Sequence, residues 1–234
     1  MKIKYHGHAC IQIHTGEKSL IIDPFLSGNP TATIKPEEII TDAVLLTHAH
    51  MDHILDAAPI ASANNDAPVV SIVELASYMS WQGVKNSIGM NMGGTFDLGF
   101  AKAKMIQAFH SSGIVIEETK QILYAGMPAG FLVFAEGLTI LHAGDTSLFS
   151  DMKMIGERHP IDVVFLPIGD HYTMGPEDAL QAAEWYNAKL TVPIHHSTFP
   201  GIKQDEKQFI KQLEERGLKG KAMAPGDVLE IVGR

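Results

Sequence analysis

The sequence predicts an α/β fold in which helices and sheets form layers. Two observations lead to this prediction. Short apolar runs typical of buried strands alternate with segments of helical character. Histidine- or aspartate-bearing motifs directly follow several of these runs. The 234 residues show no repeat and no interdomain linker, so we expect a single domain over residues 1–234.

The first 23 residues predict a meander of three short strands. The candidate strands are residues 2–5, 10–14 and 19–23. Gly7 and residues 15–18 supply the turn signals between them. Asp23-Pro24 ends the third strand and opens a long loop over residues 25–35. Long loops tend to be functional, so this loop either borders an active site or is a solvated connector.

The middle of the chain predicts alternating helices and strands. Residues 36–40 fit a short helix started by Pro36, and a second helix begins at Asp56 as N-cap with Pro59 in its first turn. The remaining expectations are strands at 43–46, 68–72 and 101–109, a helix at 73–81, and an irregular excursion near the substrate pocket at 111–130.

The last part of the chain predicts a hairpin and then further strands and helices. The hairpin joins residues 131–134 to 138–141 across Glu136-Gly137. A capping box at residues 205–208 begins a helix that ends at Gly217. The other expected elements are strands at 162–166, 190–194 and 228–232, and a helix at 176–187.

The most informative stretch follows the apolar run 43–46. Three imidazoles and a carboxylate lie within six residues there: His48, His50, Asp52 and His53. A helix is a poor host for all four, because residues two apart do not share a helix face. In a loop, His48 and His50 can converge on one metal while Asp52 and His53 point to a neighbouring metal position. A histidine-rich surface loop is the alternative, but clusters with this spacing usually mark metal sites.

The pattern H-x-H-x-D-H after an apolar strand resembles the metallo-β-lactamase-fold superfamily. Further motifs of that superfamily follow in order, at His110, Asp145 and His195. Gly7–Cys10, Ile22–Pro24 and residues 169–178 resemble a narrower branch. That branch comprises small metal-dependent hydrolases related to L-ascorbate-6-phosphate lactonase. The resemblance covers nearly the whole chain and implies a four-layer αββα sandwich with its site along one edge of the sheets.

The resemblance also implies a ligand set for two divalent cations. His48, His50 and His110 would hold the first, Asp52, His53 and His195 the second, and Asp145 would bridge them. Imidazole and carboxylate donors without a thiolate suit Zn foremost, with Mn, Fe or Ni as alternatives. Two such cations about 3.5–4 Å apart can share a water and generate a bridging hydroxide near neutral pH.

The implied activity is hydrolysis of an ester, lactone or phosphodiester bond in a small anionic substrate. Asp52 is the catalytic candidate, because it could orient the nucleophile or take its proton. His50 stands where the superfamily's oxygen-reducing diiron branch tends to carry Glu, which favours hydrolysis over redox chemistry.

Several other polar residues keep two interpretations each. His8 either reaches the site or is a turn histidine, and Asp23 either bonds a ligand histidine or serves a turn. His196 replaces His195 if the ligand is misassigned. His142 is either structural or supports a ligand. His171 and Tyr172 either contact substrate or pack. The chain shows no serine triad and no Walker-type or dinucleotide fingerprint.

Composition argues against nucleic acid and membranes as partners of this chain. The formal charge is −9 and the basic residues are scattered, so the chain lacks the basic stripe of nucleic-acid-binding proteins. No apolar stretch reaches the roughly 20 residues of a membrane span. The start lacks the apolar core of a signal peptide, and the single Cys10 excludes an intramolecular disulfide.

We therefore expect a cytoplasmic protein with a small-molecule substrate and with neither nucleic-acid nor membrane partners; association into a homo-oligomer stays open. The alternatives are an RNA- or DNA-processing nuclease of the same fold and a non-catalytic metal-binding sensor module.

Overall fold

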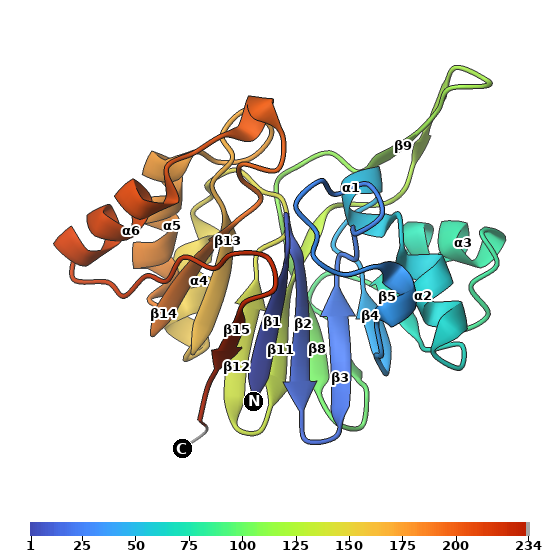
Figure 1. Ribbon diagram of the computed structural model, residues 1–234, viewed down its shortest axis with the longest axis horizontal. Helices are drawn as coiled ribbons and strands as arrows, with labels where there is room; N and C mark the ends of the chain where they lie inside the picture. Colours follow the sequence, from blue (N-terminus) through green and yellow to red (C-terminus); the bar gives the residue numbers. More distant parts are fainter. Residues whose placement is uncertain (233–234) are drawn as a thin grey trace.

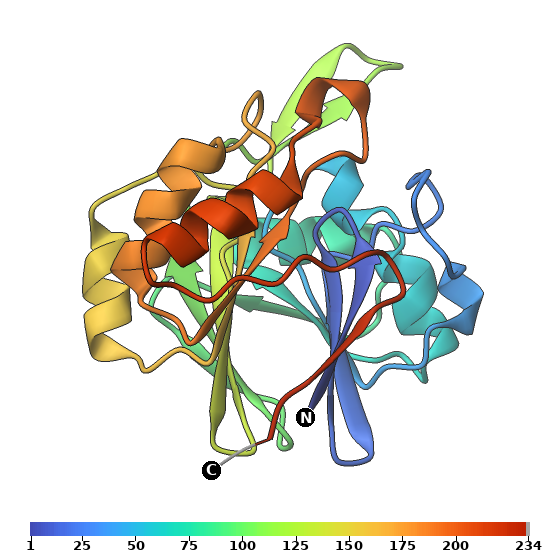
Figure 2. The ribbon, with the colours of Figure 1, turned by 60° about the vertical axis from the view of Figure 1, so that its left-hand side comes forward.

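The computed structural model describes residues 1–232 and contains two large sheets packed face to face, with helices on both outer sides (Figures 1 and 2). The first sheet has the strand order β15-β1-β2-β3-β4-β5-β6. The second has the order β14-β13-β12-β11-β8-β7. A separate two-stranded hairpin, β9 and β10, projects from this body (Figure 1). This arrangement is the predicted four-layer sandwich.

The first sheet begins with the predicted antiparallel meander and continues with parallel strands. Its strands are β1 (Lys2–Gly7), β2 (Cys10–Thr15), β3 (Lys18–Ile22), β4 (Ala43–Leu45), β5 (Val69–Ile72), β6 (Ser87–Met90) and β15 (Val228–Glu230). The helical elements on this side are η1 (Pro36–Glu38), α1 (Met51–Ile54), α2 (Ala57–Ala63) and α3 (Val73–Trp81). β15 pairs with β1 and forms one edge of the sheet, so strands from distant parts of the sequence lie side by side there.

The second sheet follows in sequence. Its strands are β7 (Thr95–Asp97), β8 (Lys102–Gln107), β11 (Ala129–Ala135), β12 (Leu138–His142), β13 (Val163–Pro167) and β14 (Leu190–Ile194). The hairpin β9 (Gly113–Ile116) and β10 (Gln121–Tyr124) interrupts them. The helical elements are α4 (Asp151–Arg158), α5 (Pro176–Tyr186), η2 (Pro200–Ile202) and α6 (Glu206–Glu215). Asp205 caps α6 by accepting from the backbone N–H of Gln208, which is one half of the predicted capping box.

Two hydrophobic clusters hold these layers together. The larger joins side chains of both sheets, such as Ile13 of β2 and Phe131 of β11, to α2 and α3. The smaller packs the opposite face of the second sheet, including Leu141, against α4, α5 and α6. Alternate residues of β11 and β12 thus face opposite clusters, because successive strand side chains point to opposite sides.

Strand direction places the polar motifs at one edge. β3 and β4 run parallel, as do β12, β13 and β14. β8 is antiparallel to β11, which is antiparallel to β12, so β8 and β12 share a direction. Within each sheet these strands therefore end at the same edge, and the 3.8 Å between His48 Nε2 and Asp145 Oδ2 shows that the two edges meet at one end of the sandwich. The residues that follow these strands include Asp23, His48, His110, Asp145 and His195.

The structure corrects several predictions about elements. Residues 111–130 are not irregular, because they contain the β9–β10 hairpin. The loop after β4 becomes helix α1 at Met51, so Asp52 and His53 lie in a helix while His48 and His50 precede it. The helix at 36–40 is a single 3₁₀ turn. The strands β6 and β7 and the helical elements α4 and η2 were not predicted from the sequence.

No helix within residues 1–232 has the length and apolar character needed to cross a membrane.

Candidate metal centre

Three imidazole nitrogens form the first group of donor atoms. His48 Nε2 lies 2.9 Å from His50 Nδ1, and His110 Nε2 lies 3.3 Å from the same atom. The three atoms lie close enough together to hold one metal ion. His48 and His50 come from the loop after β4 and His110 from the end of β8, so two distant segments build this group.

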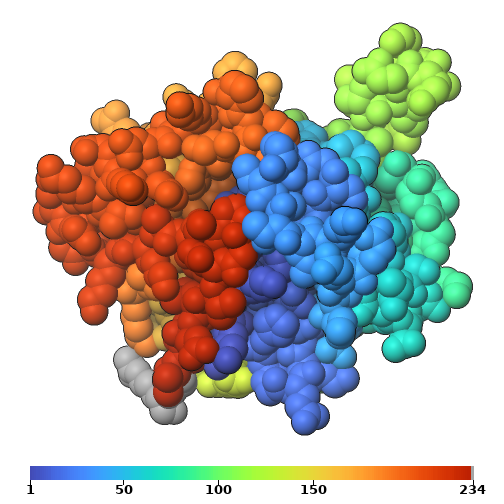
Figure 3. All heavy atoms as spheres, in the orientation of Figure 1, coloured from blue at the N-terminus to red at the C-terminus, as the bar shows by residue number. Residues whose placement is uncertain are grey.

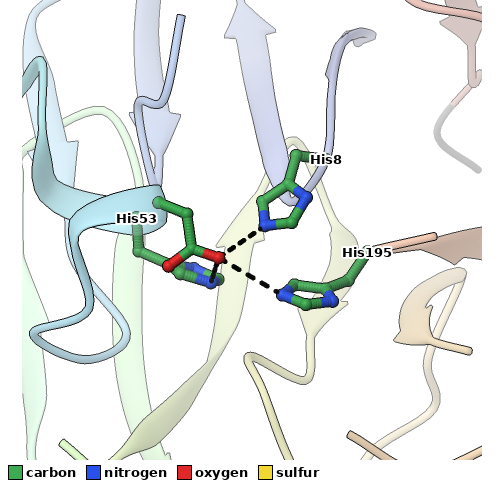
Figure 4. Close-up of side chains that lie close together, drawn as sticks. His8, His53 and His195 are labelled. Atoms are coloured by element: carbon green, nitrogen blue, oxygen red, sulfur yellow. Dashed lines mark hydrogen bonds and ion pairs between the residues drawn. The ribbon is translucent and has the colours of Figure 1, made fainter. Parts of the chain in front are cut away.

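A second group of donors surrounds the carboxylate of Asp52. Asp52 Oδ2 lies 2.9 Å from His8 Nε2, 3.7 Å from His195 Nε2 and 3.9 Å from His53 Nε2. Figure 4 shows the three imidazoles converging on one carboxylate oxygen. These four residues can hold a second metal ion. His8 therefore reaches the site, where its Nε2 can serve either as a fourth donor or as the hydrogen-bond partner that positions the Asp52 carboxylate.

Asp145 lies between the two groups. Its Oδ2 atom is 3.0 Å from His195 Nε2 and 3.3 Å from His53 Nε2. The same oxygen is 3.6 Å from His110 Nε2 and 3.8 Å from His48 Nε2. One carboxylate oxygen therefore faces nitrogens of both groups, which is the position that a bridging ligand would occupy.

The donor atoms themselves fit divalent cations. His53 Nε2, His195 Nε2 and Asp145 Oδ1 are buried and form no hydrogen bond of regular geometry among the described residues, although both nitrogens lie within 3.3 Å of Asp145 Oδ2. Leaving such atoms unpaired inside a protein is costly, so most buried polar atoms are paired. Cations between the two groups would satisfy these atoms, and nitrogen and carboxylate oxygen are donors that first-row transition metals accept.

A short hydrogen-bond chain fixes the orientation of two histidines. His53 Nδ1 donates to Asp23 Oδ2 at 2.8 Å, which leaves Nε2 facing the site. His48 Nδ1 lies 3.0 Å from Thr47 Oγ1, and that hydroxyl donates to Asp23 at 2.6 Å. Such outer partners set the tautomer and orientation of ligating imidazoles. The structure thus gives Asp23 the supporting role that was one of its two interpretations.

Burial and neighbouring charges shift the pKa values of the candidate ligands. Burial and the charge of His53 lower the pKa of His48, and burial is also the main cause that lowers the pKa of His110. Burial would raise the pKa of Asp145, but His195 and His53 outweigh it and hold this pKa well below its usual range. His48 and His110 are therefore neutral and Asp145 is ionised at neutral pH, which are the states that bind cations.

Two other histidines, His53 and His195, have raised rather than lowered pKa values. Burial would lower the pKa of His195, but Asp145 outweighs it and raises this pKa to about 9. Asp145 and Asp23 likewise outweigh burial and raise the pKa of His53. Both rings face carboxylates that favour positive charge at this point, and a metal cation can supply that charge in place of the protons.

Of the remaining polar residues that the sequence singled out, one joins the site and the others lie outside it. His195 joins the site, whereas His196 turns toward Glu206, with 3.7 Å between Nε2 and Oε2. His142 donates from Nε2 to the Ala9 carbonyl at 2.8 Å and accepts from the Gly144 N–H, so it is structural. His171 and Tyr172 are exposed and pack against each other.

Sequence reasoning missed two hydroxyl groups near the ligands. Thr198 Oγ1 lies 3.0 Å from His8 Nδ1, and Ser111 Oγ lies 3.2 Å from His50 Nε2. No local pattern marks Thr198, because its contact joins residues 190 positions apart. Ser111 directly follows the candidate ligand His110, and this neighbouring position is the signal that could have identified it.

Comparison with known proteins agrees with the fold and with a metal-dependent hydrolase family. A family model described as a beta-lactamase superfamily domain matches residues 2–195. A UPF0173 metal-dependent hydrolase of Geobacillus thermodenitrificans is 56% identical over 99% of this chain and 100% of its own length. The solved structure of Igni18, a metallo hydrolase of Ignicoccus hospitalis, is 34% identical over 99% of both chains with a TM-score of 0.87.

A more distant structure is similar in fold alone. The isothiocyanate hydrolase from Delia radicum gut bacteria is 23% identical over 100% of both chains, with a TM-score of 0.78.

Proposed function

This chain belongs to the beta-lactamase superfamily and, within it, to the UPF0173 metal-dependent hydrolases, and from that premise we propose that it uses two divalent cations to hydrolyse an ester, lactone or phosphodiester bond of a small substrate. The position of Asp145 Oδ2 carries this proposal. It lies within 3.8 Å of four imidazole nitrogens, two from each group of donors.

Seven residues would hold the two cations. His48, His50 and His110 would hold one cation, and Asp52, His53 and His195 the other, with Asp145 between them. When bound, such a pair lowers the pKa of a shared water toward about 7 and polarises the substrate carbonyl or phosphoryl oxygen. The imidazole and carboxylate donors suit Zn, Mn, Fe and Ni alike, and we propose Zn foremost among them.

Asp52 combines a charge with access to solvent. Burial would raise the pKa of this carboxyl, but His195 and His8 outweigh it and keep the pKa far below its usual range. Its side chain is 33% exposed, whereas that of Asp145 is 3% exposed. Asp52 can therefore meet a water or substrate from the open side and orient it, whereas a carboxylate whose pKa is held so low is a weak base for taking a proton near neutral pH.

The proposal selects hydrolysis of a small molecule over the rival activities. A complete set of converging donors favours catalysis over a sensor module, since a sensor needs no paired groups around a shared carboxylate. The net charge of −9 opposes binding of a large polyanion such as RNA or DNA. An anionic small substrate, and the relation to the lactonase branch, stay predictions.

A panel of chromogenic phosphodiesters, lactones and thioesters tests the proposal with Zn- and Mn-loaded protein. His50→Ala and Asp52→Ala should each lower turnover by several orders of magnitude, because each removes one donor from a group. Elemental analysis should find two cations per chain in the wild type and fewer in each variant.

His14→Ala is the matched control, because His14 lies on β2 and its imidazole is absent from both groups. It should keep the wild-type rate and metal content. Wild-type turnover in either test variant would refute the assigned roles.

A further inference from the structure

An apolar pocket adjoins the first group of donors. It has a volume of about 450 Å³, within the range of small-molecule sites. Its lining includes Phe109, His110, Ile122, Tyr124 and Met127. His110 thus belongs both to the donor group and to the lining of the pocket. The described residues that line this pocket include no Lys, Arg, Asp or Glu.

The β9–β10 hairpin supplies the outer wall of this pocket. Val115 pairs with Ile122 and Gly113 pairs with Tyr124, so these residues share one face. The opposite face carries Ile114, which is buried in the larger core cluster. One side of the hairpin therefore packs on the protein, and the other presents apolar side chains to the pocket.

That presented face is unusually apolar for a solvent-facing surface. Ile122 is 74% exposed and Tyr124 is 70% exposed, and both stand beside a candidate catalytic centre. Exposed apolar surfaces of this kind mark sites of binding. The hairpin stands away from the body, as Figures 1 and 3 show, which leaves this face open to a ligand.

The base of the hairpin is held firmly against the site. The Ala125 N–H donates to the Ser112 carbonyl at 3.1 Å, and the Ala49 N–H donates to Ser112 Oγ at 3.3 Å. Gly126, at φ +87°, packs so closely that a Cβ would lie 2.5 Å from Ile72 Cγ2. The pocket wall is therefore fixed relative to the loop that carries His48 and His50.

We propose that this pocket binds an apolar acyl group of the substrate, which makes the preferred substrate a carboxylic ester or lactone with an aliphatic or aromatic acyl chain. The inference rests on the proposed function and deepens it. The acyl group fits this role because it stays attached to the carbonyl that the cations would polarise. The neutral lining offers no countercharge to a phosphate or sulfate at that position.

Hydrolysis of p-nitrophenyl acetate, butanoate and hexanoate tests the proposal with the metal-loaded protein. Full burial of one methylene group favours binding about fourfold. In this partly open pocket, each added methylene group should raise kcat/KM about twofold. Hexanoate has four more methylene groups than acetate, so kcat/KM should rise at least about tenfold between them. The Ile122→Ser/Tyr124→Ser double variant should lose this dependence on chain length.

Ile40→Ser is the matched control, since Ile40 is 82% exposed and outside the pocket. It should keep the wild-type dependence. Turnover without any dependence on chain length, or a dependence that survives in the double variant, would overturn the pocket assignment while leaving the hydrolase proposal intact.

A second measurement does not depend on activity. In protein labelled with ¹³C in the Ile and Met methyl groups, octanoate should shift the signals of Ile122 and Met127 at concentrations where acetate does not. The signals of Ile40 and Met154, both exposed elsewhere, should stay in place. The proposal fails if octanoate moves neither pocket signal, or if protein concentration alone moves them, as a second copy of the chain on this face would do.

Discussion

His8 connects the turn after β1 to the second group of donors. In the tautomer that donates from Nε2 to Asp52, its Nδ1 accepts from the Thr198 hydroxyl. Burial and the charge of His195 lower the pKa of His8 to about 4, so the ring is neutral near pH 7. The histidine is also held at φ 57°, a conformation that costs energy and clusters at functional sites.

These contacts predict that His8 positions the Asp52 carboxylate. His8→Ala should weaken binding of the second cation by about 10–100-fold, as loss of other outer partners of ligands does. His8→Gln should recover part of this loss, because its amide can still donate to Asp52. Titration with a competing chelating dye measures both, with His14→Ala as control. Unchanged affinity in His8→Ala would exclude the positioning role.

Backbone conformation decides which of the adjacent residues His195 and His196 points into the site. The sequence left His195 and His196 as alternatives for one ligand. The structure holds His195 at φ 51°, with its N–H donating to the His8 carbonyl at 2.7 Å. This left-handed turn directs the ring of His195 into the site and leaves His196 outside it. No local pattern could have decided this, because the deciding contact is with the start of the chain.

At the scale of elements, Asp56 and Asp205 occupy equivalent positions but act differently. Both are N-cap residues, and the sequence predicted both as caps. Asp205 caps α6, whereas the buried Asp56 makes no cap bond to α2. Asp56 instead accepts from the backbone N–H groups of Leu26 and Ser27 and from the Ser27 hydroxyl. It therefore anchors the loop after β3, which carries Phe25 beside His8.

This difference predicts unequal losses of stability. Asp205→Ala should lower the free energy of unfolding by about 1 kcal/mol, the usual worth of a cap. Asp56→Ala should cost about 2–3 kcal/mol, because it leaves the buried N–H of Leu26 without a partner. Urea unfolding followed by circular dichroism measures both values. A larger loss for Asp205→Ala would contradict the anchoring role.

Helix α4 shows why some elements escape local patterns. It is only eight residues long, contains Gly156 and has no side-chain cap. A glycine inside a helix lowers its propensity by about 1 kcal/mol relative to alanine. The structure needs this glycine, because a Cβ there would lie 2.2 Å from the Trp185 carbonyl oxygen on α5. Close packing of α4 on α5 thus overrides local preference.

At the scale of the whole molecule, the cations should link the two halves of the sandwich. The donors follow strands of both sheets, and they converge only in the folded chain. Ligands that bind only the folded state stabilise it by mass action, by about 4 kcal/mol at 1,000 times the Kd.

Chelation should therefore lower the melting temperature by roughly 10 °C for a chain of this size. Differential scanning calorimetry before and after treatment with a chelator measures the change, and restoring Zn should reverse it. A melting temperature that does not respond to chelation would show that no cation joins the two sheets.

The α/β architecture and the cluster from His48 to His53 could be predicted from the sequence, because strand periodicity and ligand spacing are local properties of the chain. The ordered motifs also carried the resemblance that named His110, Asp145 and His195. Three features required the folded structure: Thr198 contacts His8, which contacts Asp52; His195 rather than His196 turns inward; and Ile122 and Tyr124 face the pocket. These are contacts between distant segments, and they depend on strand direction and on the packing of two sheets rather than on neighbouring residues.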